Sequence, residues 1–178
     1  KSYVKSSLDA EYHGNYADYA NLMEISEKDV KKQIEEDFNE SIRQQFASSD
    51  NITEEEIVAY TEKMAEVKKL AKYKVQDEKK DEDGNYTVSV KVEPSDVFQT
   101  LQQSSAEVSK EKIVQGMEET DPGVFASVLT ESVQKSIDKN SYGDSVTVTV
   151  KVEKNHSGTY ELSETERSKL ETAMFPTE

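Results

Sequence analysis

The sequence predicts an α+β fold: an antiparallel sheet of about four strands, formed by two hairpins, with amphipathic helices covering one face. Two stretches with alternating valines, YTVSVKVE at 86–93 and VTVTVKVE at 146–153, are typical of strands with one buried and one wet face. The flanking segments carry apolar residues three or four positions apart, the spacing of helices that cover such a sheet. We expect a single domain over residues 1–178.

Residues 1–71 are predicted to be helical. A first helix has Val4, Leu8 and Tyr12 on one face and ends at Gly14, and Asn15 opens a short second helix. A third helix is capped by Ser26, and a fourth begins with the capping box of Thr53 and Glu56. The apolar stripe of the third helix comprises Val30, Ile34, Phe38, Ile42 and Phe46.

Residues 72–94 are predicted to form the first hairpin, in which the turn-rich run DEDG joins two strands and Pro94 ends the second. Residues 95–140 are predicted to be helical, with a break within QQSSAEVS and a later helix that Asp121 caps and Pro122 begins. Phe125, Val128, Leu129, Val133 and Ile137 are expected to line one side of that later helix. Residues 145–176 are predicted to form a second hairpin and a terminal helix capped by Ser163.

The likeness of the two valine-rich stretches raises the question of an internal duplication. A shift of 60 residues matches them closely, but it superposes the second strand of one hairpin on the first strand of the other. A shift of 74 residues matches DGNYTVS to SGTYELS and keeps the order of elements, with less identity. Both a duplication and convergence of similar strands remain open, and the strand interpretation holds for either.

The composition excludes several classes of function. The chain is acidic, with a formal charge of −15, so it repels phosphate backbones and we expect no nucleic-acid partner. It has no cysteine, which excludes thiolate catalysis, disulfides and cysteine-ligated metals within these residues. No stretch approaches the roughly 18 apolar residues of a membrane span.

No motif points to a metal, a cofactor or a catalytic residue. DEDGN at 81–85 resembles a calcium loop, but alignment on Gly84 puts Lys79 and Val90 at the two end positions, where acidic ligands are needed. His13 and His156 are too few for a histidine-rich metal site, and both are expected to be exposed. We therefore expect neither a metal nor a cofactor.

Three tyrosines form the candidate binding site. Tyr12, Tyr16 and Tyr19 lie within eight residues, around the expected corner between the first two helices. Tyrosine suits binding surfaces because its ring contacts sugars or peptides while its hydroxyl makes hydrogen bonds. The alternative is that these rings form the rim of a core that has few leucines and phenylalanines.

The opening segment resembles an uncharacterised family of cell-surface lipoproteins of Gram-positive bacteria. The likeness rests on Tyr3, Val4, Leu8, Asp9, Ala10, Tyr12, Gly14, Tyr16 and Tyr19, and on VEPSDVF at 92–98. The resemblance implies export to the outer face of the cell membrane, with a lipidated cysteine upstream of residue 1 as the only link to the membrane. The family has no established activity, and so it implies no functional residues.

The leading hypothesis is an extracellular, lipid-anchored, non-enzymatic module that binds a small ligand, peptide, glycan or protein partner at the cell surface. A surface hydrolase that uses carboxylates in a cleft is one alternative, and a structural component of the envelope is another. The sequence gives no positive support for an enzyme, because none of its 37 acidic residues is set apart by its spacing.

Overall fold

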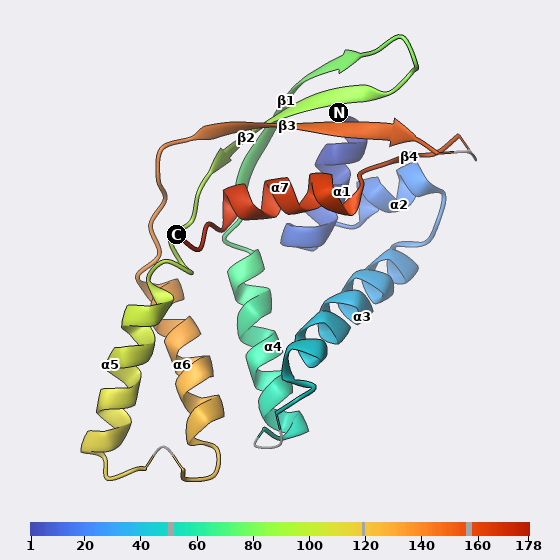
Figure 1. Ribbon diagram of the computed structural model, residues 1–178. Helices are drawn as coiled ribbons and strands as arrows, with labels where there is room; N and C mark the ends of the chain where they lie inside the picture. The colour runs from blue at the N-terminus through green and yellow to red at the C-terminus, as the bar shows by residue number, and fades with distance from the viewer. Residues whose placement is uncertain (50–51, 119, 156–157) are drawn as a thin grey trace.

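A computed structural model describes residues 1–178 with the exception of 50–51, 119 and 156–157. The described residues form a four-stranded antiparallel sheet in the order β1-β2-β3-β4, with helices packed against it (Figure 1). The predicted α+β class, with about four strands in two hairpins, is confirmed. The strands are β1 (Lys72–Lys80), β2 (Tyr86–Glu93), β3 (Val146–Lys154) and β4 (Tyr160–Glu161).

The two valine-rich stretches are the central strands β2 and β3, and they pair with each other. Val88 lies opposite Val150, and Val90 lies opposite Val148. Directly opposed residues project from the same face of a sheet, so these valines form one apolar surface, in which Val88, Val90 and Val150 are fully buried. The similar sequences of the two strands therefore match a shared environment.

Helices α1 (Ser2–His13) and α7 (Glu164–Met174) cover this apolar surface. Val4 and Leu8 of α1 and Leu170 and Met174 of α7 are buried in the same cluster as the strand valines. They come from the two ends of the chain, so the core closes only when both ends pack on the sheet. The opposite face of the sheet carries hydroxyl and charged side chains, as the alternation predicts.

Two helical hairpins extend from the sheet toward the far end of the molecule (Figure 1). The short helix α2 (Ala17–Met23) leads into the first of them. The four long helices are α3 (Glu27–Phe46), α4 (Glu54–Lys68), α5 (Leu101–Val114) and α6 (Val124–Asp138). The Ser26 hydroxyl accepts a hydrogen bond from the backbone N–H of Asp29, and Thr53 and Glu56 form a capping box, so both predicted caps are confirmed.

Three predictions about helix boundaries are wrong. Asn15 does not open α2, because Tyr16 is its N-cap residue. The expected cap at Asp121 and start at Pro122 are replaced by Gly123, whose φ of 78° is left-handed, and α6 begins at Val124. Glycine adopts this conformation without the steric cost of a Cβ, and it delays the helix by two residues. Of the predicted stripe of α6, Val133 is buried, Val128, Leu129 and Ile137 are half-buried, and Phe125 is 50% exposed.

The predicted break within QQSSAEVS is also absent, since α5 runs from Leu101 to Val114. Ser104 faces α6, where the Ser136 hydroxyl donates a hydrogen bond to its oxygen over 2.9 Å. Both serines are buried. Serine commonly weakens a helix by competing for backbone hydrogen bonds, but here the hydroxyls are used between the helices, where small side chains let α5 and α6 approach.

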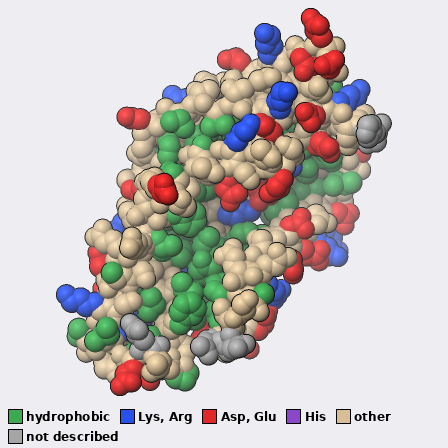
Figure 2. All heavy atoms as spheres, viewed as in Figure 1, with side chains coloured by type: hydrophobic (Ala, Val, Ile, Leu, Met, Phe, Trp, Pro, Cys, Tyr) green, Lys and Arg blue, Asp and Glu red, His purple; other side chains and the backbone are tan. Residues whose placement is uncertain are grey.

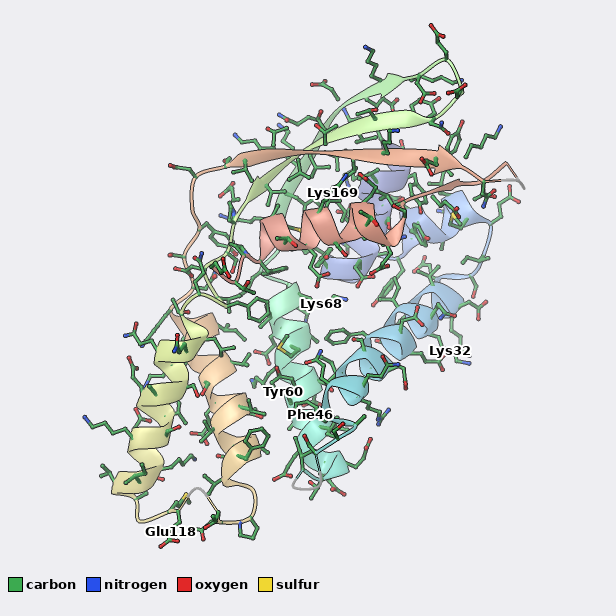
Figure 3. The ribbon with its side chains drawn as sticks, viewed as in Figure 1. Lys32, Phe46, Tyr60, Lys68, Glu118 and Lys169 are labelled. Carbon is green, nitrogen blue, oxygen red and sulfur yellow. The ribbon has the colours of Figure 1, made fainter. Side chains whose placement is uncertain are left out.

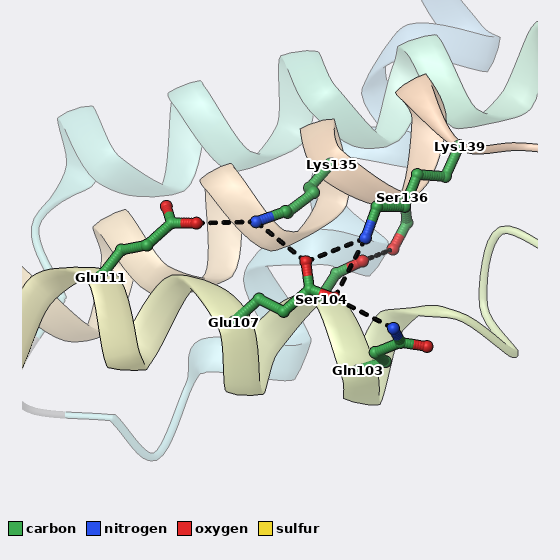
Figure 4. A network of polar contacts seen from close by, with 7 residues as sticks. All are labelled: Gln103, Ser104, Glu107, Glu111, Lys135, Ser136 and Lys139. Carbon is green, nitrogen blue, oxygen red and sulfur yellow. Dashed lines mark hydrogen bonds and ion pairs between the residues drawn. The ribbon is translucent and has the colours of Figure 1, made fainter.

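Around the serine pair, charged residues link α5 to α6 (Figure 4). Lys139 and Lys135 both bind the carboxylate of Glu107, each at 2.9 Å, and Lys135 also reaches Glu111 at 2.8 Å. Hydrogen bonds from Lys139, Lys135 and Gln103 lower the pKa of Glu107 from the usual 4.5 to about 2. The contact between α5 and α6 therefore includes an ionised carboxylate that two lysines share.

Element boundaries bear on the question of an internal repeat. The first residues of α3 and α5 are 27 and 101, those of β1 and β3 are 72 and 146, and those of β2 and β4 are 86 and 160. Each pair is 74 residues apart, so the order of elements repeats in that register. The 60-residue register superposes β2 on β3, which are neighbours with different places in their hairpins. This register is compatible with a duplication and with convergence of similar strands alike.

Shortening the central valine should destabilise the fold more than changing the wet face. Val90→Ala removes two buried methyl groups from a site with 0% exposure, and we expect unfolding to require about 2 kcal/mol less. Thr149→Ala, on the other face of the sheet, should cost less than about 1 kcal/mol. Urea denaturation of the two variants measures both values, and equal losses would contradict the assignment of the buried face.

Acid should weaken the chain partly through Glu107. A carboxyl whose folded pKa is about 2 and whose unfolded pKa is near 4.5 stabilises the fold above pH 4.5, and this stabilisation is lost as the pH falls toward 2. Glu107→Gln should therefore show a shallower loss of stability across this window than the parent chain. Lys139→Met, which keeps the carboxyl and removes one cation, should lie between them. Parallel curves from urea denaturation at each pH would contradict the role of this carboxylate.

Candidate functional site

Two of the three predicted tyrosines line a groove between α3 and α4. An upper cavity of about 430 Å³ is bounded by Tyr12, Tyr16 and residues of α3 and α4, and an adjoining lower cavity of about 340 Å³ lies farther along the same helices. The two cavities share Glu35, Phe38 and Ala65 as lining residues, so they form one continuous depression. We call this depression the α3–α4 groove.

The groove exists because α3 and α4 are not packed along their whole length. Of the predicted apolar stripe of α3, only Val30 and Ile42 are buried. The other three members, Ile34, Phe38 and Phe46, are half-buried. Figure 1 shows the two helices diverging from their shared tip toward the sheet, and the apolar side chains that face the gap form the floor of the groove.

At the lower end, a ring contact joins the helices. Phe46 of α3 and Tyr60 of α4 meet edge to face, with ring centroids 5.3 Å apart and an interplanar angle of 89° (Figure 3). Such aromatic pairs add about 1 kcal/mol beyond the area that they bury. Figure 2 shows apolar side chains at the surface over α4, so the neighbouring helices do not cover α4 completely.

Lys68 closes the upper end of the groove (Figure 3). Its ammonium lies 4.5 Å from the centre of the Phe38 ring and 5.6 Å from the centre of the Tyr12 ring, and it forms an ion pair with Glu11. Cations are attracted to the negative faces of aromatic rings. The lysine thus occupies the ring faces that a ligand would otherwise contact.

The tyrosines have different surroundings. Tyr12 packs against Phe175 and Tyr73 with ring centroids 6.2 and 6.4 Å away, and burial, followed by the nearby Glu171 and Glu11, raises its pKa. Tyr16 packs beside the small buried cluster around Ala10, Ala20 and Val30. Tyr19 packs on Tyr3 at 6.1 Å and is not among the residues that line the groove. The predicted site and the predicted core rim therefore share Tyr12.

A polar cluster that sequence reasoning missed lies beside the groove. The Tyr73 hydroxyl donates a hydrogen bond to Asp9 over 2.8 Å and lies 3.2 Å from Nδ1 of His13. The His13 ring stacks on the Tyr73 ring at 5.1 Å, and its Nε2 bonds the carbonyl of Ala71. Burial and the hydrogen bond to Asp9 raise the pKa of Tyr73, so its hydroxyl stays protonated and ties α1 to β1.

The sequence indicates that two members of this cluster, Asp9 and His13, lie together, but not the third. Asp9 and His13 are four residues apart on a helix, the spacing that puts two side chains on one face. Tyr73 comes from a strand sixty residues later, and nothing local connects it to them. His13 is exposed, as expected, whereas His156 lies outside the described residues.

A second, wider hollow of about 1090 Å³ lies between the tips of the two helical hairpins, near Thr53 and Phe125. Its lining residues come from segments that neighbour, in the sequence, positions 50–51 and 119, which lie outside the described part of the chain. In the described residues, no three histidine, aspartate or glutamate side chains gather closely enough to hold a metal ion. The α3–α4 groove, by contrast, is lined by helices α1, α3 and α4, whose residues are described throughout.

Comparisons with known proteins concern the fold. No family model matches the sequence, and no curated protein matches it. A solved structure of "a putative lipoprotein (ycdA) from Bacillus subtilis" is similar, with a TM-score of 0.67 and 13% sequence identity. The similarity covers 97% of this chain and 55% of the other, so this chain spans about half the length of that protein. At this identity the likeness shows a shared fold.

Among helices built from described residues, none has both the length and the apolar character required to cross a bilayer.

Truncation should separate the two groove tyrosines. Tyr12→Ala removes a ring that packs against Phe175 and Tyr73, and we expect a loss of about 3 kcal/mol in the free energy of unfolding. Tyr16→Ala should cost about 1 kcal/mol, since its ring lies at the edge of a smaller cluster. Urea denaturation measures both losses. If Tyr12→Ala costs no more than Tyr16→Ala, the core-rim role of Tyr12 is wrong.

Proposed function

We propose that this chain is an extracellular, lipid-anchored binding module, and that the α3–α4 groove takes a peptide segment of a partner protein. The anchoring is supported by the resemblance of the opening segment to cell-surface lipoproteins. The fold shared with a Bacillus subtilis structure described as "a putative lipoprotein" is consistent with it. The groove, with its half-buried apolar floor, carries the binding proposal.

The dimensions of the groove suit a peptide. Along α4 and its C-cap the lining runs from Ile57 to Lys69, which at 1.5 Å per residue is roughly 18 Å. That length accommodates about five residues of an extended chain or about three turns of a helix. Grooves between helices are a recurring site for amphipathic peptides, whose apolar side chains enter at regular intervals.

The chemistry of the groove favours a peptide over a sugar. Its floor is apolar, with Phe38, Ala65 and Ile57, and its rim carries charges of both signs, such as Arg43 and Glu62. A glycan would stack on open ring faces, but Lys68 lies over both Phe38 and Tyr12. An apolar segment flanked by acidic and basic residues matches these surfaces.

The hydrolase alternative receives less support from this geometry. Acid–base hydrolysis needs two carboxyl groups in different environments, positioned on a substrate. Two acids line the upper cavity, and both are held in ion pairs: Glu11 by Lys68 and Glu35 by Lys31. A carboxylate with a permanent cationic partner is suited to holding Lys68 in place across the rings rather than to transferring protons.

Selection from a random peptide library tests the proposal. We expect the parent chain to enrich peptides with spaced apolar residues, and Ala65→Arg, which fills the junction of the two cavities, to weaken their binding at least about tenfold. Val58→Glu should weaken binding to the lower half of the groove. Leu22→Glu changes an exposed apolar residue outside the groove lining and serves as the control.

The outcomes of this selection are distinct. Enriched peptides that bind the parent chain and Leu22→Glu equally, and Ala65→Arg poorly, would support the groove. Peptides that bind Ala65→Arg as well as the parent, or a selection that enriches none, would overturn it. Circular dichroism of each variant shows whether it is folded.

A further inference from the structure

The uncovered face of the sheet carries a compact group of lysines. In the registers of β1, β2 and β3, Lys74 lies opposite Lys91, and Lys91 lies opposite Thr147. Farther along, Lys79 lies opposite Thr87, and Thr87 lies opposite Lys151. Ser89 and Thr149 fill the row between them. We call Lys74, Lys79, Lys91 and Lys151, with these four hydroxyl residues, the lysine patch.

The patch has few acidic neighbours: Glu166 lies near Lys151, whose charge helps to lower the pKa of that carboxyl, and Glu153 is two residues from Lys151 on the same face of β3. All four lysines are exposed, and within the described residues none of them forms an ion pair. Asp77, in the irregular part of β1, is the acid in the same rows, and the acidic turn at 81–83 lies beyond their end. Glu93 forms an ion pair with Lys72, with 3.2 Å between the ammonium nitrogen and the carboxylate oxygen.

Repulsion among the lysines of the patch destabilises the sheet unless anionic groups bind there. Like charges directly opposite each other destabilise a strand pair, and Lys74 faces Lys91 in this way. The rest of the molecule has the opposite sign, since the whole chain has a formal charge of −15. One face of the sheet is therefore locally basic, and the excess acidic charge of the chain lies elsewhere in the molecule.

The N-terminus lies beside the same sheet (Figure 1). The terminal amine of Lys1 is 2.5 Å from Glu78 of β1, and α1 then runs under the strands. A lipid joined to this point by a short segment would hold the sheet, rather than the hairpin tips, next to the bilayer. This step rests on the anchoring proposed above and is independent of the peptide groove.

We propose that the lysine patch docks on the anionic headgroups of a lipid bilayer. Each lysine close to an anionic membrane surface strengthens the interaction by about fivefold, and the effect decays within roughly 8 Å at physiological salt. The patch extends about 13 Å along the strands and its four lysines are exposed, so their flexible side chains can reach one membrane surface. The acidic helical hairpins are then held away from the membrane, with the α3–α4 groove open to partners.

Energy transfer on tethered protein tests the docking. The chain has no cysteine, so Thr149→Cys in the patch and Ser48→Cys at a hairpin tip each accept a single donor dye. The labelled chain is coupled at its N-terminus to a lipid in vesicles that contain headgroup acceptors. The vesicles are made of phosphatidylcholine, either alone or with phosphatidylglycerol.

On vesicles with phosphatidylglycerol we expect transfer from position 149 to rise about twofold over phosphatidylcholine alone, and transfer from position 48 to fall. High salt should remove the difference. Lys74→Gln with Lys91→Gln should also remove it, whereas Lys28→Gln with Lys110→Gln, the same charge change on exposed helical lysines, should not.

Equal transfer on the two kinds of vesicle would overturn the docking, as would a difference that survives Lys74→Gln with Lys91→Gln. Because the tether is supplied by coupling, neither result depends on the natural anchor. Peptide binding to the groove is measured separately in solution, so failure of one proposal is distinguishable from failure of the other.

Discussion

The fold depends on the burial of one valine surface. Val88, Val90 and Val92 of β2, with Val150 and Val152 of β3, are 0–3% exposed, and they supply the centre of the core. Fully burying a valine contributes about 1.5–3 kcal/mol, before conformational entropy is subtracted. The surface is too wide for one helix, and the two helices that cover it come from opposite ends of the sequence. The core is therefore complete only when the last helix of the chain has packed on the sheet.

The use of α1 and α7 as the cover determines what the other long helices do. α3, α4, α5 and α6 must pack mainly on one another, in a chain with only 34% hydrophobic residues. The α5–α6 pair meets this shortage with two buried serines and with the ion pairs of Glu107, Lys135 and Lys139. Among the described residues, the α3–α4 pair is joined by one ion pair, Arg43 with Glu54, and by the Phe46–Tyr60 contact, and it stays partly open. The groove is thus the place where the apolar side chains are too few to close the structure.

Patterns with a short period predicted most of the fold. Alternating valines located β2 and β3, and the hydroxyl caps located the starts of α3, α4 and α7, because these signals are contained in a few neighbouring residues. The start of α6 was missed because Asp-Pro is a strong helix signal, and the left-handed Gly123 that overrides it is visible only in the backbone. The continuity of α5 was missed because Ser104 is stabilised by Ser136, thirty-two residues away.

The candidate site was less predictable, for a related reason. The tyrosine-rich corner drew attention to Tyr12 and Tyr16, but the remaining walls come from α3 and α4, whose residues read as ordinary core stripes. Whether a stripe is buried or open depends on the angle between two helices, and this angle is not encoded in either helix alone. The lysines of the sheet read only as wet-face residues, since their grouping requires the register of three strands.

The short connection after α4 has a mechanical consequence. α4 ends at Lys68 and β1 begins at Lys72, and between them Ala71 is buried while its carbonyl is held by His13. Because so few residues join this helix to this strand, and these residues are anchored, the connection cannot absorb a rotation of the helix. We expect α4 and β1 to move together. Any widening between α3 and α4 that shifts α4 is therefore carried to the outer strand of the sheet, and an event at one end of the molecule is mechanically linked to the other.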